Sequence, residues 1–199
     1  MKRIAAIVTA AGASRRFGPE SKLHAPLDGL PLIERTLRAL QALPLAEVLV
    51  VLAPGDETIR AIAARLGFET VENPDPAAGL GSSIACGARA LSRATDGALL
   101  CLGDMPLAPA AAGTKLIARY EDCADGVVLV PVHGGRRGHP VLFDRAHFAA
   151  LTALGGDRGA RALLAGPAVV EVPVDDAGVL LDVDTPEDLA ALEAGAPGG

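Results

Sequence analysis

Short runs of apolar residues without a polar break recur along this chain, and segments with a helical repeat separate them. Such runs are typical of strands buried on both faces of a parallel sheet. The predicted strands span residues 4–9, 47–53, 69–72, 97–102, 127–131, 141–144, 169–174 and 180–184. The predicted helices span residues 31–40, 57–66, 79–91, 109–122, 145–154 and 158–164, and a last one begins after Thr185. This alternation predicts an α/β fold with a mostly parallel sheet and helices on both faces.

The predicted elements follow one another without an internal repeat or a linker. We therefore expect a single three-layer, Rossmann-like domain over residues 1–194, with a disordered tail at 195–199. In such sheets ligands bind at the carboxyl ends of the strands. The loop after the first strand and residues 103–106 and 182–184 all follow predicted strands, so we expect them to converge at one site.

The loop after the first strand combines small residues with positive charge. Gly12 opens it, and Arg15, Arg16 and Lys22 follow. Bare backbone N–H groups surrounded by cations are suited to a polyanion such as a triphosphate. The spacing matches neither the P-loop nor the dinucleotide-binding glycine pattern. An ordinary glycine turn with solvated arginines is the alternative.

Composition narrows the partners and the compartment. Lys and Arg number 18 against 24 Asp and Glu, so the net charge is −6, which is unusual for a nucleic-acid-binding protein. The three cysteines have no metal-site or disulfide spacing, so we expect reduced thiols in a cytoplasmic protein. No stretch has the ~20 apolar residues of a membrane span. Residues 1–13 resemble a brief signal peptide, but we interpret them as the first strand because a coherent loop follows.

Aspartates at two predicted strand ends are candidates for a magnesium site. Asp104 ends an apolar strand, and Mg²⁺ prefers one or two carboxylates together with phosphate oxygens. The alternative is a turn aspartate that binds backbone N–H groups. Asp182 and Asp184 alternate along the predicted strand 180–184, so only one of them can face the same ion. Asp184 is our choice for the second ligand, and Asp182 is the reserve.

Two further segments carry candidate binding residues. Gly79, Ser82 and Ser83 open a predicted helix, where the serines either cap the helix or contact a base or ribose. The basic segment 136–140 places His139 beside two arginines, which suits a second anionic ligand, although a lone histidine is usually structural. No serine–histidine–acid or cysteine–histidine set suggests covalent hydrolysis.

Taken together, these segments resemble the molybdopterin nucleotidyltransferases, in particular their cytidylyltransferase branch. The resemblance extends from Ile4 to about Leu192, with Phe17 at a position where the family usually has Met. It rests on residues 9–18 (TAAGASRRFG) with Lys22, and on residues 73–75 (NPD), 79–83 (GLGSS), 102–106 (LGDMP), 138–141 (GHPV) and 181–189 (LDVDTPEDL).

This resemblance implies a role for each matching residue. The nucleotide would be bound by Thr9, Ala10, Ala11, Gly12, Ser14, Arg16, Lys22, Gly79, Ser82 and Ser83. Arg16, Lys22 and Asp104 would be catalytic, and Asp104 and Asp184 would hold Mg²⁺. Arg137, Gly138 and His139, within an acceptor-binding part at about 130–165, would contact the pterin.

The implied reaction joins the α-phosphate of CTP to the terminal phosphate of molybdopterin, or of the molybdenum cofactor, and releases pyrophosphate. A molybdoenzyme or its maturation chaperone is a possible further partner. The alternatives are a guanylyltransferase, a cytidylyltransferase for a sugar or polyol phosphate, and a non-catalytic cofactor-loading chaperone. Guanylyl-transferring relatives typically have Gly where this chain has Ala11, so we expect a narrower base pocket that favours CTP over GTP.

Overall fold

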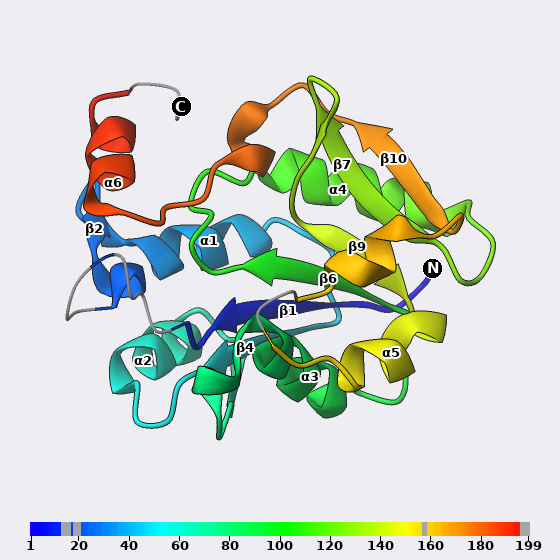
Figure 1. Cartoon of the computed structure of the whole chain (residues 1–199), viewed down its shortest axis with the longest axis horizontal. Coiled ribbons are helices and arrows are strands. Elements are labelled where there is room, and N and C mark those ends of the chain that lie inside the picture. The colour runs from blue at the N-terminus through cyan, green and yellow to red at the C-terminus, as the bar shows by residue number, and fades with distance from the viewer. Residues whose placement is uncertain (13–16, 18–20, 157–158, 196–199) are drawn as a thin grey trace.

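A mixed sheet forms the centre of the molecule in the computed structural model, which describes residues 1–12, 17, 21–156 and 159–195 (Figure 1). The strand order is β10-β7-β9-β6-β1-β4-β5, and β8 pairs with β7. The strands are β1 (Ile4–Ala10), β4 (Glu47–Leu52), β5 (Glu69–Glu72), β6 (Gly97–Leu102), β7 (Val128–His133), β8 (Arg136–Arg137), β9 (Val141–Asp144) and β10 (Val169–Pro173). The pairs β1–β4, β1–β6, β4–β5 and β7–β10 are parallel, which confirms the predicted α/β class.

Within the described part of the central sheet, antiparallel pairing involves only β8 and β9, because the chain reverses directly after β7. Gly134 and Gly135 both have positive φ angles, of 56° and 79°, as a two-residue hairpin turn requires. His133 then pairs with Arg136, and β9 continues between β7 and β6. The basic segment 136–140 therefore begins as the short strand β8 of a hairpin, and only its remainder is a loop.

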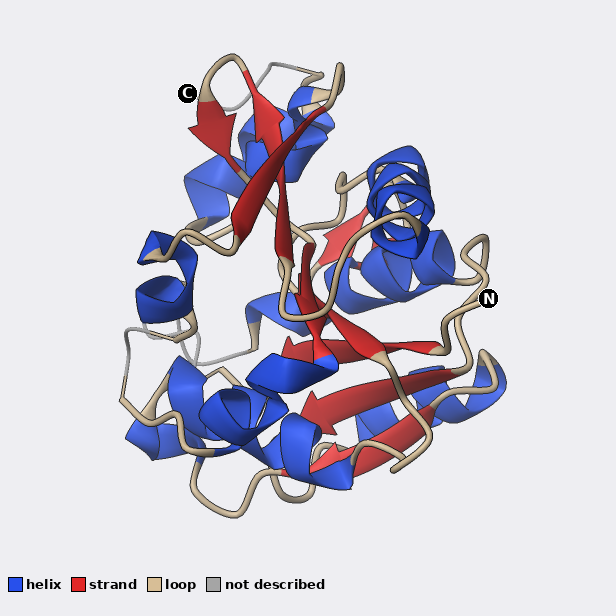
Figure 2. Cartoon of the chain, turned by 90° about the vertical axis from the view of Figure 1, so that its right-hand side faces the viewer, coloured by secondary structure: helices blue, strands red, loops and turns tan. Residues whose placement is uncertain are grey.

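Helices cover both faces of the sheet, and β1 contributes alternate residues to each face. Ile4, Ala6 and Val8 pack with α1 (Leu32–Leu40), α2 (Glu57–Arg65) and α4 (Ala110–Glu121). Ile7 packs on the opposite face with α3 (Leu80–Ala90) and α5 (Phe148–Thr152). Figures 1 and 2 show the sheet between these two layers.

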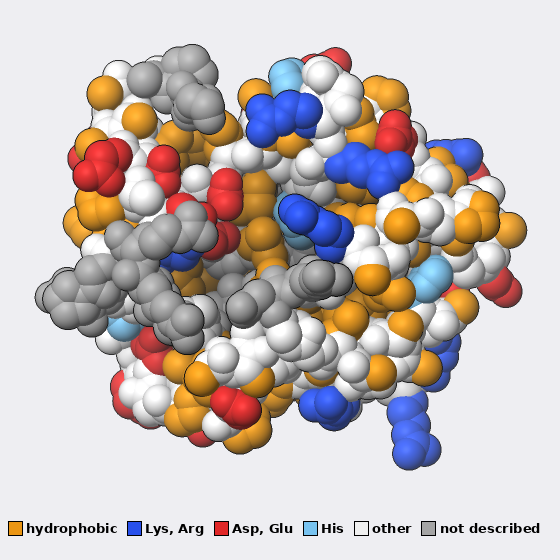
Figure 3. Space-filling model, in the orientation of Figure 1, with side chains coloured by type: hydrophobic (Ala, Val, Ile, Leu, Met, Phe, Trp, Pro, Cys, Tyr) orange, Lys and Arg blue, Asp and Glu red, His pale blue; other side chains and the backbone are white. Residues whose placement is uncertain are grey.

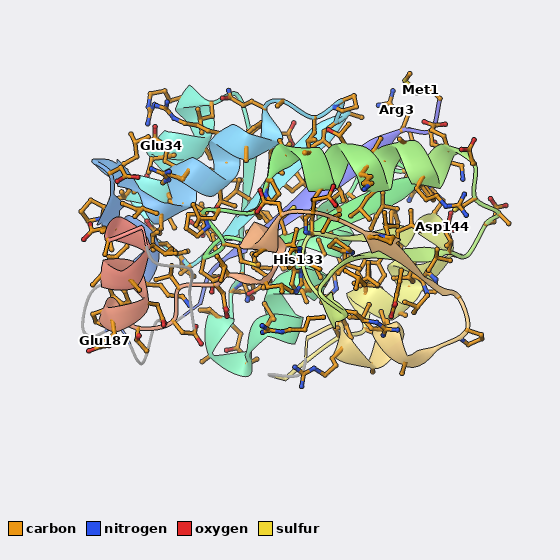
Figure 4. All side chains as sticks on the ribbon, turned by 90° about the horizontal axis from the view of Figure 1, so that it is seen from above. Met1, Arg3, Glu34, His133, Asp144 and Glu187 are labelled. Carbon is orange, nitrogen blue, oxygen red and sulfur yellow. The ribbon has the colours of Figure 1, made fainter. Side chains whose placement is uncertain are left out.

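The last helix lies apart from these layers. α6 (Pro186–Glu193) begins with the predicted Thr185 cap, whose hydroxyl accepts from the backbone N–H of Asp188 at 3.2 Å. α6 packs beside the small hairpin of β2 (Pro26–Leu27) and β3 (Leu30–Pro31), through Leu189 and Leu192. Figure 4 shows Glu187 of α6 at one end of the molecule and Met1 and Arg3 at the other. No described helix is long and apolar enough to cross a membrane.

Two predicted elements differ from the structure. Residues 180–184 are not a strand: the 3-10 turn η5 (Ala177–Leu180) leads into an extended segment whose Val183 N–H donates to the Asp104 carbonyl at 2.9 Å. This segment pairs with loops, so no neighbouring strand completes a ladder. The predicted helix at 158–164 is a 3-10 turn, η4 (Arg161–Ala165), and Arg158 lies outside the described residues. The region 145–154 also begins as a 3-10 turn, η3 (Arg145–His147), before α5.

Candidate active site

The end of β1 places the first predicted nucleotide-binding residues in the centre of the sheet. Thr9 is buried, and its hydroxyl lies 3.5 Å from the carbonyl of Cys101 on β6. Ala10 and Ala11 are also buried, whereas no described residue lies within 4 Å of the position that a Cβ of Gly12 would take. Among the described residues, none packs against Gly12 at the carboxyl end of β1. Ser14, Arg15 and Arg16 lie outside the described residues.

Three of the predicted residues meet at this end of the sheet. Lys22, the first residue of the 3-10 turn η1 (Lys22–His24), lies with its Nζ 2.7 Å from Asp104 Oδ2 and 2.7 Å from Asp184 Oδ1. Asp104 follows β6 and Asp184 directly precedes the α6 cap. One ammonium group thus joins three segments that are far apart in the sequence, 22–24, 103–106 and 182–184.

Backbone contacts position the two carboxylates. The Gly103 N–H donates to the Thr9 carbonyl at 3.0 Å, and a Cβ on Gly103 would lie 2.8 Å from that oxygen. β6 therefore passes close to β1 just before Asp104. The bond from Val183 to the Asp104 carbonyl brings Asp182 and Asp184 alongside, and the Asp188 carboxylate accepts from the Asp184 N–H at 3.0 Å.

The electrostatics of this cluster favour a cation. Burial alone lowers the pKa of Lys22, but the charges and hydrogen bonds of Asp104 and then Asp184 outweigh it, so the pKa is raised. Burial, followed by repulsion from Asp104, raises the pKa of Asp182. Asp104 Oδ1 is buried and has no hydrogen-bond partner among the described residues. A buried carboxylate oxygen without a partner is costly, so this atom is suited to binding a ligand.

The predicted serines belong to a hydrogen-bonded network around Asn73. Its side-chain amide donates to Ser82 Oγ at 2.8 Å and to Ser83 Oγ at 3.1 Å, and its Oδ1 accepts from the Asp75 N–H. The Ser82 hydroxyl also lies 2.8 Å from the Gly79 carbonyl. These bonds shape the start of α3. Asn73 is 2% exposed and is a residue that the site prediction missed, although the NPD motif contained it.

The predicted acceptor residues separate into two environments. Arg137 is exposed and pairs with Glu171 of β10, with Nε 2.8 Å from Oε1. His139 points inward, and its Nδ1 is buried without a partner among the described residues. Burial lowers the pKa of His139, against opposing contributions from the Leu100 backbone, Asp104 and Asp182. The imidazole is therefore neutral near pH 7 and lies within electrostatic range of the carboxylate cluster.

Gly138 explains how His139 comes to face this cluster. A Cβ on Gly138 would lie 2.2 Å from the Val179 carbonyl oxygen, which accepts from the His139 N–H at 2.8 Å. Any larger residue would push the 136–140 segment away from the segment that carries Asp182 and Asp184. Figure 3 shows a hollow on this face, with acidic side chains on one side, Lys and Arg side chains on the other, and hydrophobic side chains within it.

The comparisons with known proteins agree with this geometry. Residues 6–173 match the family described as the MobA-like NTP transferase domain. The chain belongs to this family.

Within the MobA-like family, the similarity to particular proteins covers nearly the whole chain. The molybdenum cofactor cytidylyltransferase of Escherichia coli K12 is 29% identical over 94% of both chains. Nicotine blue oxidoreductase of Paenarthrobacter nicotinovorans is 28% identical over 95% of this chain and 96% of its own. The manganese complex of Rv0371c from Mycobacterium tuberculosis has a TM-score of 0.80 and 26% identity, and covers 97% of this chain and 98% of its own.

Proposed function

We propose that this protein transfers CMP from CTP to the terminal phosphate of molybdopterin or of the molybdenum cofactor. One observation carries the proposal: Lys22, Asp104 and Asp184 converge at the carboxyl ends of the central strands. A cation and two carboxylates at that edge suit a nucleotide triphosphate with a divalent ion. The full-length similarity to the E. coli cytidylyltransferase supports CTP and the pterin acceptor.

The residues present fit Mg²⁺, because the buried atom without a hydrogen-bond partner among the described residues, Asp104 Oδ1, is a carboxylate oxygen, the type of ligand that Mg²⁺ prefers. Asp104 and Asp184 would hold the ion, and the manganese complex of Rv0371c is consistent with a divalent cation in a related protein. The described residues contain no group of three or more His, Cys, Asp or Glu that could hold a metal. Triphosphate oxygens and water would therefore complete the shell. The bound ion would neutralise charge on the phosphate oxygens.

The proposed chemistry needs no protein nucleophile. An oxygen of the acceptor phosphate forms a bond to the α-phosphorus of CTP, the bond to the β-phosphate oxygen breaks, and pyrophosphate leaves with that electron pair. Lys22 would contact the phosphates and balance their charge, and Arg16 is expected to do the same on sequence grounds. Most of the remaining work is the alignment of two phosphates for in-line attack. The neutral His139, whose other nitrogen donates to the Leu100 backbone, would accept one hydrogen bond at Nδ1 on the acceptor side.

The decisive experiment is product analysis with purified protein, Mg²⁺, molybdopterin, and CTP and GTP at equal concentration. We expect pyrophosphate and the cytosine dinucleotide, with CTP favoured at least tenfold, which corresponds to about 1.4 kcal/mol. The methyl group of Ala11 and the ordered serines of α3 are the residues that we expect to restrict the base. A mainly guanine product would overturn the cytidylyl assignment and leave nucleotidyl transfer intact.

The same experiment separates the remaining functions. A sugar or polyol phosphate that replaces molybdopterin as the acceptor would identify another cytidylyltransferase. Cofactor binding without pyrophosphate release would indicate a loading chaperone. The nicotine blue oxidoreductase relative raises a redox activity as a further alternative. Reduction of nicotine blue by the purified protein, without nucleotide transfer, would contradict the proposal.

A further inference from the structure

Lys22 occupies the position between the two carboxylates proposed as metal ligands. Its Nζ contacts Asp104 Oδ2 and Asp184 Oδ1, each at 2.7 Å, so these two oxygens are no more than twice that distance apart. The Lys22 side chain is only 12% exposed. An ammonium group shielded in this way compensates the carboxylate charge from inside the protein, as a bound cation would.

The same lysine is the cation that the proposed reaction needs at the phosphates. An ammonium and a divalent ion at one carboxylate pair would compete for the same lone pairs and repel each other. When a polyanion is bound beside them, both cations can be accommodated, because the Lys22 side chain can move so that its ammonium group contacts a phosphate oxygen instead of the carboxylates. The charge then stays balanced, because each negative group keeps a positive neighbour.

The structure around Lys22 allows its side chain to move from the carboxylates to a phosphate while its backbone stays in place. Leu23, the next residue, is 3% exposed, and His24 Nε2 lies 3.1 Å from both carboxylate oxygens of Asp56, the cap of α2. The turn η1 is thus anchored to the core and to α2. A lysine has four flexible carbons, so the ammonium can move by rotation of its own stem.

We propose that Lys22 excludes free divalent cations from Asp104 and Asp184, and that the site takes its metal only together with a nucleotide triphosphate, which draws the ammonium onto its phosphates. The nucleotide half of this inference rests on the proposed function, but the exclusion half does not. The competing arrangement is one in which the ion binds through Asp104 Oδ1 while Lys22 stays in place.

The test is Mn²⁺ binding to nucleotide-free protein, followed by electron paramagnetic resonance, for wild type, Lys22→Met and Lys115→Met. Lys115 is an exposed lysine of α4, so its loss changes the net charge equally without touching the carboxylates. We expect Lys22→Met to bind Mn²⁺ at least tenfold more tightly than wild type, and Lys115→Met to match wild type. Equal or weaker binding by Lys22→Met would overturn the exclusion.

Two further measurements keep the test decisive if Lys22→Met is unstable. Lys22→Gln removes the charge but keeps a polar end, and Mn²⁺ should raise the melting temperature of either variant more than that of wild type. In wild type, a non-hydrolysable CTP analogue should tighten Mn²⁺ binding at least tenfold, and this gain should shrink in Lys22→Met. Tight apo binding by the variant, combined with no analogue effect on wild type, would sustain the exclusion and overturn the nucleotide half together with the CTP assignment.

Discussion

The amino-terminal and carboxyl-terminal edges of the sheet both contain buried or partly buried charged side chains, but these are hydrogen-bonded in different ways. At the amino-terminal edge of β6, the Tyr120 hydroxyl lies 2.6 Å from Asp144 Oδ2 and 2.7 Å from the Asp96 carbonyl. Lys2 donates to the Tyr120 and Cys123 carbonyls and lies 4.0 Å from the centroid of the Tyr120 ring. Figure 4 shows Asp144 toward the same end of the molecule as Met1 and Arg3.

At the carboxyl edge the polar groups are only partly satisfied. The two buried side-chain atoms without a partner among the described residues, Asp104 Oδ1 and His139 Nδ1, both lie there. Protein groups complete the hydrogen bonds at the amino-terminal edge, whereas at the carboxyl edge two polar atoms are without a partner among the described residues. Because orphan buried polar atoms cost stability, the contrast indicates that one edge stabilises the fold and the other is built for a ligand.

Replacing one aspartate at each edge by asparagine should give the largest difference between the edges, in turnover for one variant and in stability for the other. Asp104→Asn should lower turnover about 100-fold or more, roughly 2.7 kcal/mol or more of transition-state stabilisation, with little change in stability. Asp144→Asn is the matched control, with normal turnover and a lower melting temperature. Steady-state pyrophosphate release and thermal unfolding measure both. Near wild-type turnover of Asp104→Asn at saturating Mg²⁺ would remove Asp104 from the machinery.

The same assay on the neighbouring aspartates decides the second ligand. We expect Asp184→Asn to lose more activity than Asp182→Asn, since Asp184 shares Lys22 with Asp104. The reverse order would make Asp182 the ligand.

Tyr120→Phe tests the satisfied edge alone. The change removes the hydroxyl that donates to Asp144 Oδ2 and leaves a buried carboxylate oxygen short of a donor, so it should cost about 1–3 kcal/mol of unfolding free energy. Urea unfolding measures this loss, and kcat should not change. A large loss of kcat at normal stability would show that this edge takes part in the reaction.

His139→Ala tests the second orphan atom. Because Nδ1 is buried without a partner among the described residues and is proposed to bind the acceptor, its loss should raise the KM for molybdopterin about tenfold, or roughly 1.4 kcal/mol, while CTP binding stays nearly constant. His139→Gln, which keeps a polar end, should recover part of the loss. An equal decrease in CTP affinity would show that the imidazole serves the nucleotide or the fold.

The pH dependence of stability should give the smallest difference. Burial raises the pKa of Asp144, but the Tyr120 hydroxyl and backbone N–H groups outweigh it, and the net pKa is lowered. A lowered folded pKa contributes stability that is present above the ordinary value of about 3.9 and is lost as the pH falls through the folded value. Asp144→Asn should therefore lose less stability than wild type between pH 5 and pH 3. Parallel curves for the two proteins would refute this linkage.

The sequence predicted the parallel core well, because β1, β4 and β6 are continuous apolar runs, which are typical of strands buried on both faces of a parallel sheet. It predicted the 180–184 segment wrongly, since its apolar content suggested a strand although its Val183 N–H pairs with the Asp104 carbonyl of a loop. The contact between Lys22 and Asp184 joins residues 162 positions apart, so no local pattern reports it. Asn73 was missed although it belongs to the NPD motif, because its hydrogen bonds to Ser82 and Ser83 depend on how α3 begins.

Hydrogen exchange with and without CTP and Mg²⁺ tests most directly whether the carboxyl edge is the ligand-binding edge. The account predicts slower exchange in peptides covering 9–12, 79–83 and 103–105, and unchanged exchange in peptides covering 96–97, 120–123 and 144–147. Protection confined to the second set, or absent from both sets at saturating nucleotide, would contradict it.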